Sequence, residues 1–248
     1  MMDNQFQFPT EVVDLPSKGL LYPKDSPLSS GTIEMKYMTA KEEDILTNQN
    51  YIQKGTVVDN LLRSLIVDKT IKYGDLLVGD KNALLVAARI LGYGKDYEFD
   101  YLGEKQTVDL SQVGNVDIDY TPLEKGENRF QYTLPSSGVE IEFKLLTHSD
   151  TIKIDQEIAG LKKVSKDASP ELSTRLKHML VSVNGSTEQK DIRNFVDNFF
   201  LARDSRAFRE HIKTVQPDVD LTFYPEGGPE GGMPIPIGVS FLWPDAGI

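Results

Sequence analysis

Two segments of the chain alternate apolar and polar residues, as a strand with one buried face does. They are Ile33–Met38 (IEMKYM) and Ile141–Leu146 (IEFKLL), and the two patterns can be aligned position by position. Successive side chains of a strand point to opposite faces, so each segment has one apolar face. We therefore predict two half-buried strands that occupy equivalent places in two similar parts of the chain.

A helix is predicted directly after each of these strands. Thr39 is followed three residues later by Glu42, and Thr147 by Asp150, which is the spacing of a capping box at a helix N-terminus. Further along each half, apolar residues recur at helical spacing and predict a second helix. The first of these stripes is Val57, Val58, Leu61, Leu62, Leu65 and Ile66, and the second, after Ser169-Pro170, is Leu172, Leu176, Met179, Leu180 and Val183.

Each half is then expected to end with one more helix and a hairpin. Asp80 and Asp204 are predicted to cap the starts of these last helices, which end at Gly92–Gly94 and just before Pro217. The sequences that follow are strand-like and contain turn residues, which predicts hairpins. The predicted strand pairs are Tyr97–Tyr101 with Gln106–Leu110, and Leu221–Tyr224 with Ile235–Trp243.

Short matches in a conserved order indicate an internal duplication. Leu15–Gly19 (LPSKG) returns as Leu134–Gly138 (LPSSG), and Leu61–Ile66 (LLRSLI) matches Leu176–Val181 (LKHMLV). The predicted strands and the predicted last helices match in the same order. We therefore expect an α+β protein made of two duplicated strand–helices–hairpin modules.

The predicted organisation has four parts. Residues 1–30 contain four prolines and are expected to form an extended N-terminal arm with little regular structure. Residues 31–120 form the first module, and residues 121–128 form a polar linker with proline and glycine. Residues 129–248 form the second module with its C-terminal hairpin.

Charge and composition argue against several classes of protein and of partner. The 248 residues include no cysteine, which excludes disulfides and thiolate metal ligands, and the formal net charge is −11. This charge repels a polyanion such as DNA, and the basic residues between Arg193 and Lys213 alternate with acidic ones, as on a solvated, salt-bridged face. No apolar run reaches the ~20 residues of a membrane span. We expect neither nucleic acid nor a membrane as a partner.

The sequence contains no recognisable catalytic motif. His148, His178 and His211 lack the spacing of a metal site and are interpreted as surface or capping histidines. The glycines of Leu91–Lys95 do not form a phosphate-binding loop, and Glu226–Gly232 is interpreted as a solvated loop. We therefore predict that the protein is not an enzyme and that it binds no metal, cofactor or small molecule.

Both terminal regions have the apolar character of protein contacts. The beginning of the chain has few predicted internal partners, and the end carries the only tryptophan. Apolar termini of this kind often hold subunits together, although both regions could also fold back on their own domains. The candidate contact residues are Phe6, Phe8, Val12, Leu15, Leu20, Tyr22, Ile235, Ile237, Phe241 and Trp243.

Ordered landmarks along nearly the whole chain carry a family resemblance. They are Leu15–Tyr22 (LPSKGLLY), Ser29–Gly31, Met38–Glu43, Gly79–Asn82, Tyr93-Gly94, Ile235–Ile237 and Phe241–Pro244 (FLWP). This series resembles the baseplate hub subunit of T-even-like contractile-tailed bacteriophages, a family related to tail-assembly proteins. The resemblance implies a non-enzymatic component of the virion tail baseplate, assembled in the host cytoplasm. It also implies that the partners are other baseplate hub and tail proteins.

This chain departs from the family's pattern before its final strands. Many relatives are expected to carry a C-x-x-C pair there, like half of a zinc ribbon. This chain has Glu226–Glu230 (EGGPE) at that place and offers no thiolate. Metal binding is therefore not carried over, and we expect packing alone to hold the last hairpin.

The sequence leaves three other functions open. A tail-assembly chaperone that is absent from the mature virion would need the same binding surfaces. A divalent-cation-dependent hydrolase or nuclease would need a carboxylate cluster beside a catalytic base, which the sequence does not reveal. A bacterial regulatory adaptor without a phage role would be indicated by a gene neighbourhood that lacks tail genes.

Overall fold

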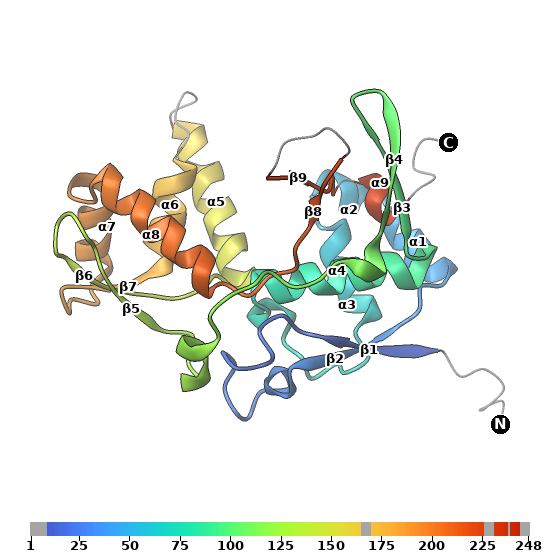
Figure 1. The fold of residues 1–248 in the computed structure, drawn as a ribbon, viewed down its shortest axis with the longest axis horizontal. Helices are drawn as coiled ribbons and strands as arrows, with labels where there is room; N and C mark the ends of the chain where they lie inside the picture. The colour runs from blue at the N-terminus through green and yellow to red at the C-terminus, as the bar shows by residue number, and fades with distance from the viewer. Residues whose placement is uncertain (1–8, 165–169, 226–230, 238, 244–248) are drawn as a thin grey trace.

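The computed structural model describes residues 9–164, 170–225, 231–237 and 239–243, and it combines helices with small antiparallel sheets (Figure 1). The predicted α+β class is confirmed. The strands are β1 (Thr10–Asp14), β2 (Thr32–Lys36), β3 (Asp96–Tyr101), β4 (Glu104–Asp109), β5 (Phe130–Thr133), β6 (Glu140–Phe143), β7 (Leu180–Val183), β8 (Thr222–Phe223) and β9 (Met233–Pro234). The helices are α1 (Ala40–Leu46), α2 (Gln49–Gln53), α3 (Val57–Leu65), α4 (Val78–Tyr93), α5 (His148–Val164), α6 (Glu171–Met179), α7 (Gln189–Asn198), α8 (Ala202–Val215) and α9 (Val239–Leu242). Short 3₁₀ helices are η1 (Pro27–Ser30), η2 (Tyr73–Asp75), η3 (Leu110–Gln112) and η4 (Thr121–Lys125).

The first half of the chain, from β1 to β4, begins with a hairpin of β1 and β2. In β2, Ile33 and Met35 are buried while Glu34 is exposed, so the strand predicted from the alternating pattern is confirmed. After α3, Ile66 forms an antiparallel bridge with Met35 and extends this small sheet. Helix α3 buries Leu61, Leu62 and Leu65 of its predicted apolar stripe, and α4 ends before Gly94, which has a φ of 85° and closes the helix.

The second half also begins with an antiparallel sheet that is followed in sequence by helices. Strands β5, β6 and β7 form one antiparallel sheet, and α5 and α6 lie between β6 and β7 in sequence. Phe143 of β6 is fully buried, with its ring centroid 5.2 Å from that of Phe130 and 4.9 Å from that of Phe208 on α8. Helix α8 ends at Val215, in agreement with the predicted end before Pro217.

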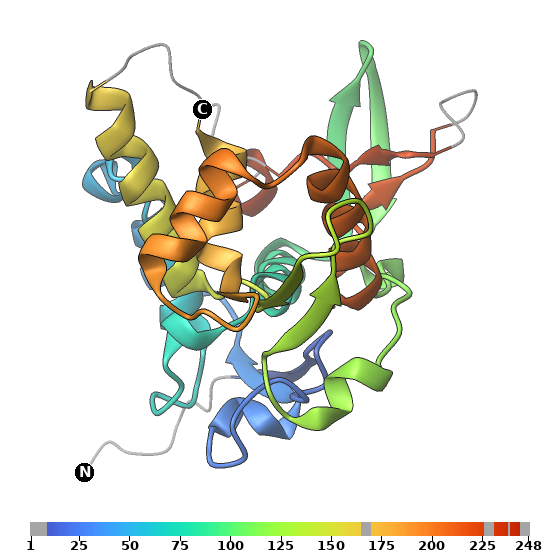
Figure 2. The same ribbon diagram turned by 90° about the vertical axis from the view of Figure 1, so that its left-hand side faces the viewer.

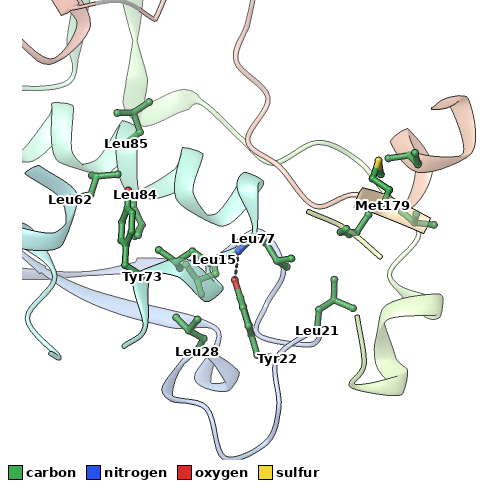
Figure 3. Close-up of a cluster of buried hydrophobic side chains, with 14 of the residues drawn as sticks. Leu15, Leu21, Tyr22, Leu28, Leu62, Tyr73, Leu77, Leu84, Leu85 and Met179 are labelled. Atoms are coloured by element: carbon green, nitrogen blue, oxygen red, sulfur yellow. Dashed lines mark hydrogen bonds between the residues drawn. The ribbon is translucent and has the colours of Figure 1, made fainter. Parts of the chain in front are cut away.

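The N-terminal segment is not an extended arm, so this prediction is wrong for the described part of residues 1–30. Residues 10–14 pair with β2, and Leu15 and Tyr22 are buried in the core. The Tyr22 hydroxyl accepts a hydrogen bond from the Leu77 N–H at 2.9 Å (Figure 3) and donates one to Asp80 Oδ2 at 2.5 Å. The prolines of the N-terminal segment therefore lie in a folded loop over α4. Residues at the start of α4 supply the hydrogen-bonding partners that an isolated extended backbone lacks.

The two aspartates predicted as helix caps have a different role. Asp80 and Asp204 lie inside the first turns of α4 and α8, where they accept hydrogen bonds from the preceding Leu-Pro-Ser turns. Ser17 donates to Asp80 from its N–H at 2.9 Å and from its hydroxyl at 2.7 Å. The N–H groups of Ser136 and Ser137 donate to Asp204 at 2.7 and 3.0 Å. Each buried carboxylate therefore accepts hydrogen bonds from a turn that is distant in sequence and holds that turn against the helix, rather than capping its own helix.

Both predicted capping boxes are present, and each includes a lysine. Glu42 accepts hydrogen bonds from the Thr39 hydroxyl at 2.6 Å and from Lys36 Nζ at 2.7 Å. Asp150 accepts them from the Thr147 hydroxyl at 3.0 Å and from Lys144 Nζ at 2.7 Å. Burial raises the pKa of Glu42, but its bonds to Lys36, Ser64 and Thr39 dominate and lower it to about 2. The folded state therefore favours the carboxylate over the protonated acid.

We expect Glu42→Gln to lower the free energy of unfolding by about 2–3 kcal/mol at neutral pH, because it removes a buried charge-assisted acceptor. A carboxylate with a lowered folded pKa stabilises above its ordinary value of 4.5 and loses that contribution as the pH falls toward about 2. The acid loss of stability should therefore be shallower in Glu42→Gln, measured by urea unfolding across this range. Glu43→Gln, on the exposed face of the same helix, is the control, and equal slopes for the two variants would contradict the expectation.

The ends of the two halves cross over each other. Hairpin β3–β4 forms where predicted, whereas the predicted strand at Ile235–Trp243 is wrong, because Val239–Leu242 is helix α9. Helix α9 packs on α4 of the first half, and β8 and β9 lie beside β3–β4 (Figures 1 and 2). In return, the segment after β4 runs along the second half, where the Asp119 N–H donates to the Thr214 carbonyl at 3.1 Å.

The segment expected as a polar linker takes part in this packing. Leu123 of η4 is fully buried, and the Tyr120 hydroxyl donates to the Pro16 carbonyl at 2.9 Å. Most of the buried apolar residues of both halves form one continuous cluster. Among the described helices, none combines the length and the apolar character needed to cross a bilayer.

Candidate protein-docking site

The two halves of the chain meet at the start of α4. Leu77 forms an antiparallel bridge with Thr147, and the His148 N–H donates to the Leu76 carbonyl at 2.8 Å. Gly79 lies so close to the backbone of Pro217 that a Cβ atom at this position would be 1.9 Å from the Pro217 oxygen. The junction is therefore a tight backbone contact, which only a glycine permits here.

An apolar cavity of about 260 Å³ opens beside this contact, between the start of α4 and helices α6 and α8. We call it the junction groove. Leu172 on its wall keeps 46% of its surface exposed, although it belongs to the apolar stripe of α6. The groove is lined by Leu77, Val78, Gly79, Leu145, Leu146, Leu172, Arg175, Leu176, Met179, Arg209, Ile212, Gln216 and Pro217.

The charge of the junction groove is positive, in contrast to the net charge of the chain. Its lining includes Arg175 and Arg209 and no acidic side chain. Arg209 Nε donates to the Ser205 carbonyl at 3.3 Å, and neither guanidinium forms an ion pair with any residue that the structure describes. An apolar recess beside two unpaired arginines is suited to an apolar side chain that is flanked by carboxylates.

A second cavity, of about 400 Å³, lies between the N-terminal loop and the segment before α4. Its volume is larger, but its walls carry both signs of charge, with Lys72 facing the same space as Asp25 and Asp75. Polar residues such as Thr70 and Asn128 complete it. Mixed charges of this kind are typical of a solvated cleft, so the junction groove is the better candidate for a docking site.

The interpretation of His148 as a surface or capping residue is wrong, because this side chain is buried between the halves. Its Nε2 lies 3.3 Å from Asp59 Oδ2, and its Nδ1 lies 3.3 Å from Lys81 Nζ. Asp59 also accepts hydrogen bonds from Lys81 at 2.7 Å and from the Tyr73 hydroxyl at 3.0 Å. Burial and the nearby Lys81 lower the pKa of His148. The cluster joins α3, α4 and α5 and leaves the imidazole almost no solvent contact, which indicates a structural role.

The other two histidines also have protein partners. His178 Nε2 lies 2.9 Å from Glu157 Oε2, and Glu157 pairs with Arg193 at 2.6 Å. The His211 ring stacks on Tyr132 with 4.3 Å between centroids. Within the described ranges, no group of three or more His, Asp or Glu side chains is placed to hold a metal ion, and Glu226–Glu230 lies outside those ranges.

The structure divides the predicted contact residues into separate groups. Four of them form part of the chain's own core, so they are not available to a partner: Leu15, Tyr22, Ile235 and Phe241. Leu20 and Trp243 are partly buried and pack against this core. Val12 and Ile237 are exposed, with 67% and 41% of their surfaces accessible. Phe6 and Phe8 lie outside the described residues.

The residues of the junction groove were not among the predicted contacts. Its leucines come from segments that are far apart in sequence, and alternation or helical periodicity indicates only that such residues are buried somewhere. One local signal did exist in α6. Arg175 lies three residues after Leu172 and four before Met179, so a charged side chain interrupts the apolar face of this helix.

Comparison with known proteins does not assign the chain to a family. No protein-family model, curated protein or solved structure matches it.

Proposed function

We propose that this protein is a non-enzymatic structural or assembly component of a contractile phage tail baseplate hub, and that it binds other hub and tail proteins. The observation that carries a binding role is the junction groove, where an apolar recess lies beside Arg175 and Arg209. The assignment to the baseplate hub rests on the ordered sequence landmarks from Leu15 to Trp243.

The landmarks occupy positions that the fold depends on. Ser17, in the first landmark, donates twice to Asp80, and Asp80 lies in the landmark Gly79–Asn82. In the closing landmark, Phe241 is fully buried against Tyr97. A relative that shared these residues in this order would require the same contacts, so the series supports a common fold rather than a set of unrelated short matches.

We further propose that the chain arose by duplication of one module. Matched contacts support this origin. Lys36 pairs with Glu42 as Lys144 pairs with Asp150, in each case between a lysine at or just after the end of a strand and the first turn of the next helix. The Leu-Pro-Ser turns donate to Asp80 and Asp204 in the same way. Superposition of residues 10–93 on residues 129–215 tests the idea, and helices that run in unrelated directions would contradict it.

We also propose a partner contact at the free edge of β1. Val12 is exposed on β1, which pairs with β2 along one edge. Hydrogen-bonded and non-hydrogen-bonded residue pairs alternate along this antiparallel hairpin. The N–H and C=O groups of Thr10, Val12 and Asp14 belong to the non-hydrogen-bonded pairs and point away from β2. An edge strand of this kind can accept a strand from another protein. Val12, with Phe6 and Phe8 before it in the sequence, is therefore the part of the N-terminal segment that we propose as a partner contact.

Mass spectrometry of purified particles tests the proposed function. For a phage that carries this gene, we expect the protein in purified tails, at a fixed ratio to other baseplate proteins. A protein that binds tail proteins in infected-cell lysates but is absent from finished particles would instead be an assembly chaperone. Absence from both particles and tail-protein complexes would contradict the proposal.

A further inference from the structure

The β3–β4 hairpin carries an unusual residue at its tip. Tyr101 pairs with Glu104, so the turn consists of two residues, Leu102 and Gly103, with φ values of 51° and 87°. Leu102 is 86% exposed. The hairpin projects from the body of the protein (Figures 1 and 2).

A leucine is poorly suited to this turn. Two-residue hairpin turns with positive φ favour Asn-Gly or Asp-Gly, because a larger side chain in the left-handed region is strained. The chain uses the favoured pair elsewhere, at Asn184-Gly185, with φ values of 47° and 81°. At the tip of β3–β4 it instead places an apolar side chain in water at a cost in backbone strain. A contact made by Leu102 would explain this choice.

The charges beside Leu102 complement those of the junction groove. Asp100 and Glu104 flank the tip and Lys105 lies opposite Asp100, so the tip keeps a net negative charge, whereas the groove presents Arg175 and Arg209 around an apolar recess. The groove volume of about 260 Å³ exceeds the ~150 Å³ in which a cavity binds a benzene-sized group. The recess can therefore take one leucine side chain, with a carboxylate on either side of it.

We propose that the hairpin tip of one copy of this chain inserts Leu102 into the junction groove of a second copy. Asp100 and Glu104 then face Arg175 and Arg209. The tip and the groove are different surfaces, so the contact is head-to-tail and can continue into a ring or a filament. The contact is small, so we expect weak association that becomes strong only in a larger assembly. This self-association deepens the proposed assembly function and rests on it.

Sedimentation velocity of the full chain, at concentrations up to about 0.5 mM, tests the proposal. The wild type should associate with increasing concentration, and Leu102→Asn should remain monomeric. Leu102→Asn should also unfold about 2–4 °C higher, because asparagine relieves the strain of the turn. Loss of association in a more stable protein cannot be attributed to misfolding.

A charge exchange identifies the partner surface. The hairpin variant Asp100→Lys with Glu104→Lys, and the groove variant Arg175→Glu with Arg209→Glu, should each be monomeric. A mixture of the two should associate, because the unchanged tip of the groove variant fits the unchanged groove of the hairpin variant, and the lysines of the other tip meet the glutamates of the other groove. A monomeric wild type, association that Leu102→Asn leaves unchanged, or a mixture that stays monomeric would overturn the proposal. Presence of the protein in purified tails does not depend on these results, so the two proposals can fail separately.

Discussion

Gly79→Ala is expected to lower the free energy of unfolding by about 3 kcal/mol, at the upper end of what overpacking usually costs. The new Cβ atom would lie 1.9 Å from the Pro217 oxygen and 2.8 Å from the Asp218 Cα. Both are backbone atoms, which cannot rotate away as a side chain can. The start of α4 must therefore separate from residues 217–218, and the hydrogen bond from Asn82 Nδ2 to Asp218 Oδ1, now 3.0 Å, should lengthen or break.

Urea unfolding of Gly79→Ala measures this effect, and Gly160→Ala is the matched control. Gly160 lies in α5, where a Cβ atom would meet none of the described atoms within 4 Å. Alanine is the better helix former, so the control should gain about 0.5–1 kcal/mol. Because Gly79 lines the junction groove, its substitution should also weaken any binding there. Equal stabilities for the two variants would show that the junction can move without cost.

Features that depend on a few neighbouring residues could be predicted from the sequence. The alternation in β2 and β6, the capping boxes at Thr39 and Thr147, and the glycine that ends α4 all act within one or two turns of chain. Each has a local physical cause, either a side-chain period or a hydrogen bond to a nearby backbone group. These features placed most of the elements correctly.

Features that depend on distant partners could not be predicted. The position of Asp80 in the sequence is suited to a helix cap. In the structure its carboxylate instead accepts hydrogen bonds from Ser17 and Tyr22, which are 63 and 58 residues away in sequence. The apolar run near Phe241 satisfied both strand and helix patterns, and packing on α4 decided between them. The burial of His148 could not be foreseen from its interpretation as a surface or capping residue, because burial between two halves leaves no local pattern.

The junction groove is one of the features that depend on residues far apart in sequence. The junction groove is made where segments from four parts of the chain converge, so its apolar lining is indistinguishable in sequence from ordinary core. The hairpin tip is different, because its residues are neighbours in the sequence. A leucine before glycine at a two-residue turn is visible in the sequence once the register is known, but the predicted strand pair, Tyr97–Tyr101 with Gln106–Leu110, left a longer connection and concealed it. A shift of the turn by one residue changes which side chain lies at the tip.

Phe241→Ala is expected to lower the free energy of unfolding by about 3–5 kcal/mol, the usual range for a buried phenylalanine. The Phe241 side chain is fully buried, and its ring lies 4.9 Å from the Tyr97 ring in an edge-to-face arrangement. Leu242 beside it is buried as well, and α9 packs on α4. The end of the chain therefore stabilises the first half, and its loss should loosen both halves together.

Thermal and urea unfolding of Phe241→Ala should shift together as one transition, because a single apolar cluster spans both halves. Ile237→Ala, four residues earlier and 41% exposed, should change the stability by no more than about 0.5 kcal/mol. Separate transitions in Phe241→Ala would indicate that the halves unfold independently and that α9 only covers the first. An equal loss of unfolding free energy in Ile237→Ala would indicate that the whole C-terminal segment packs on the first half as a unit, without a particular role for the Phe241 ring.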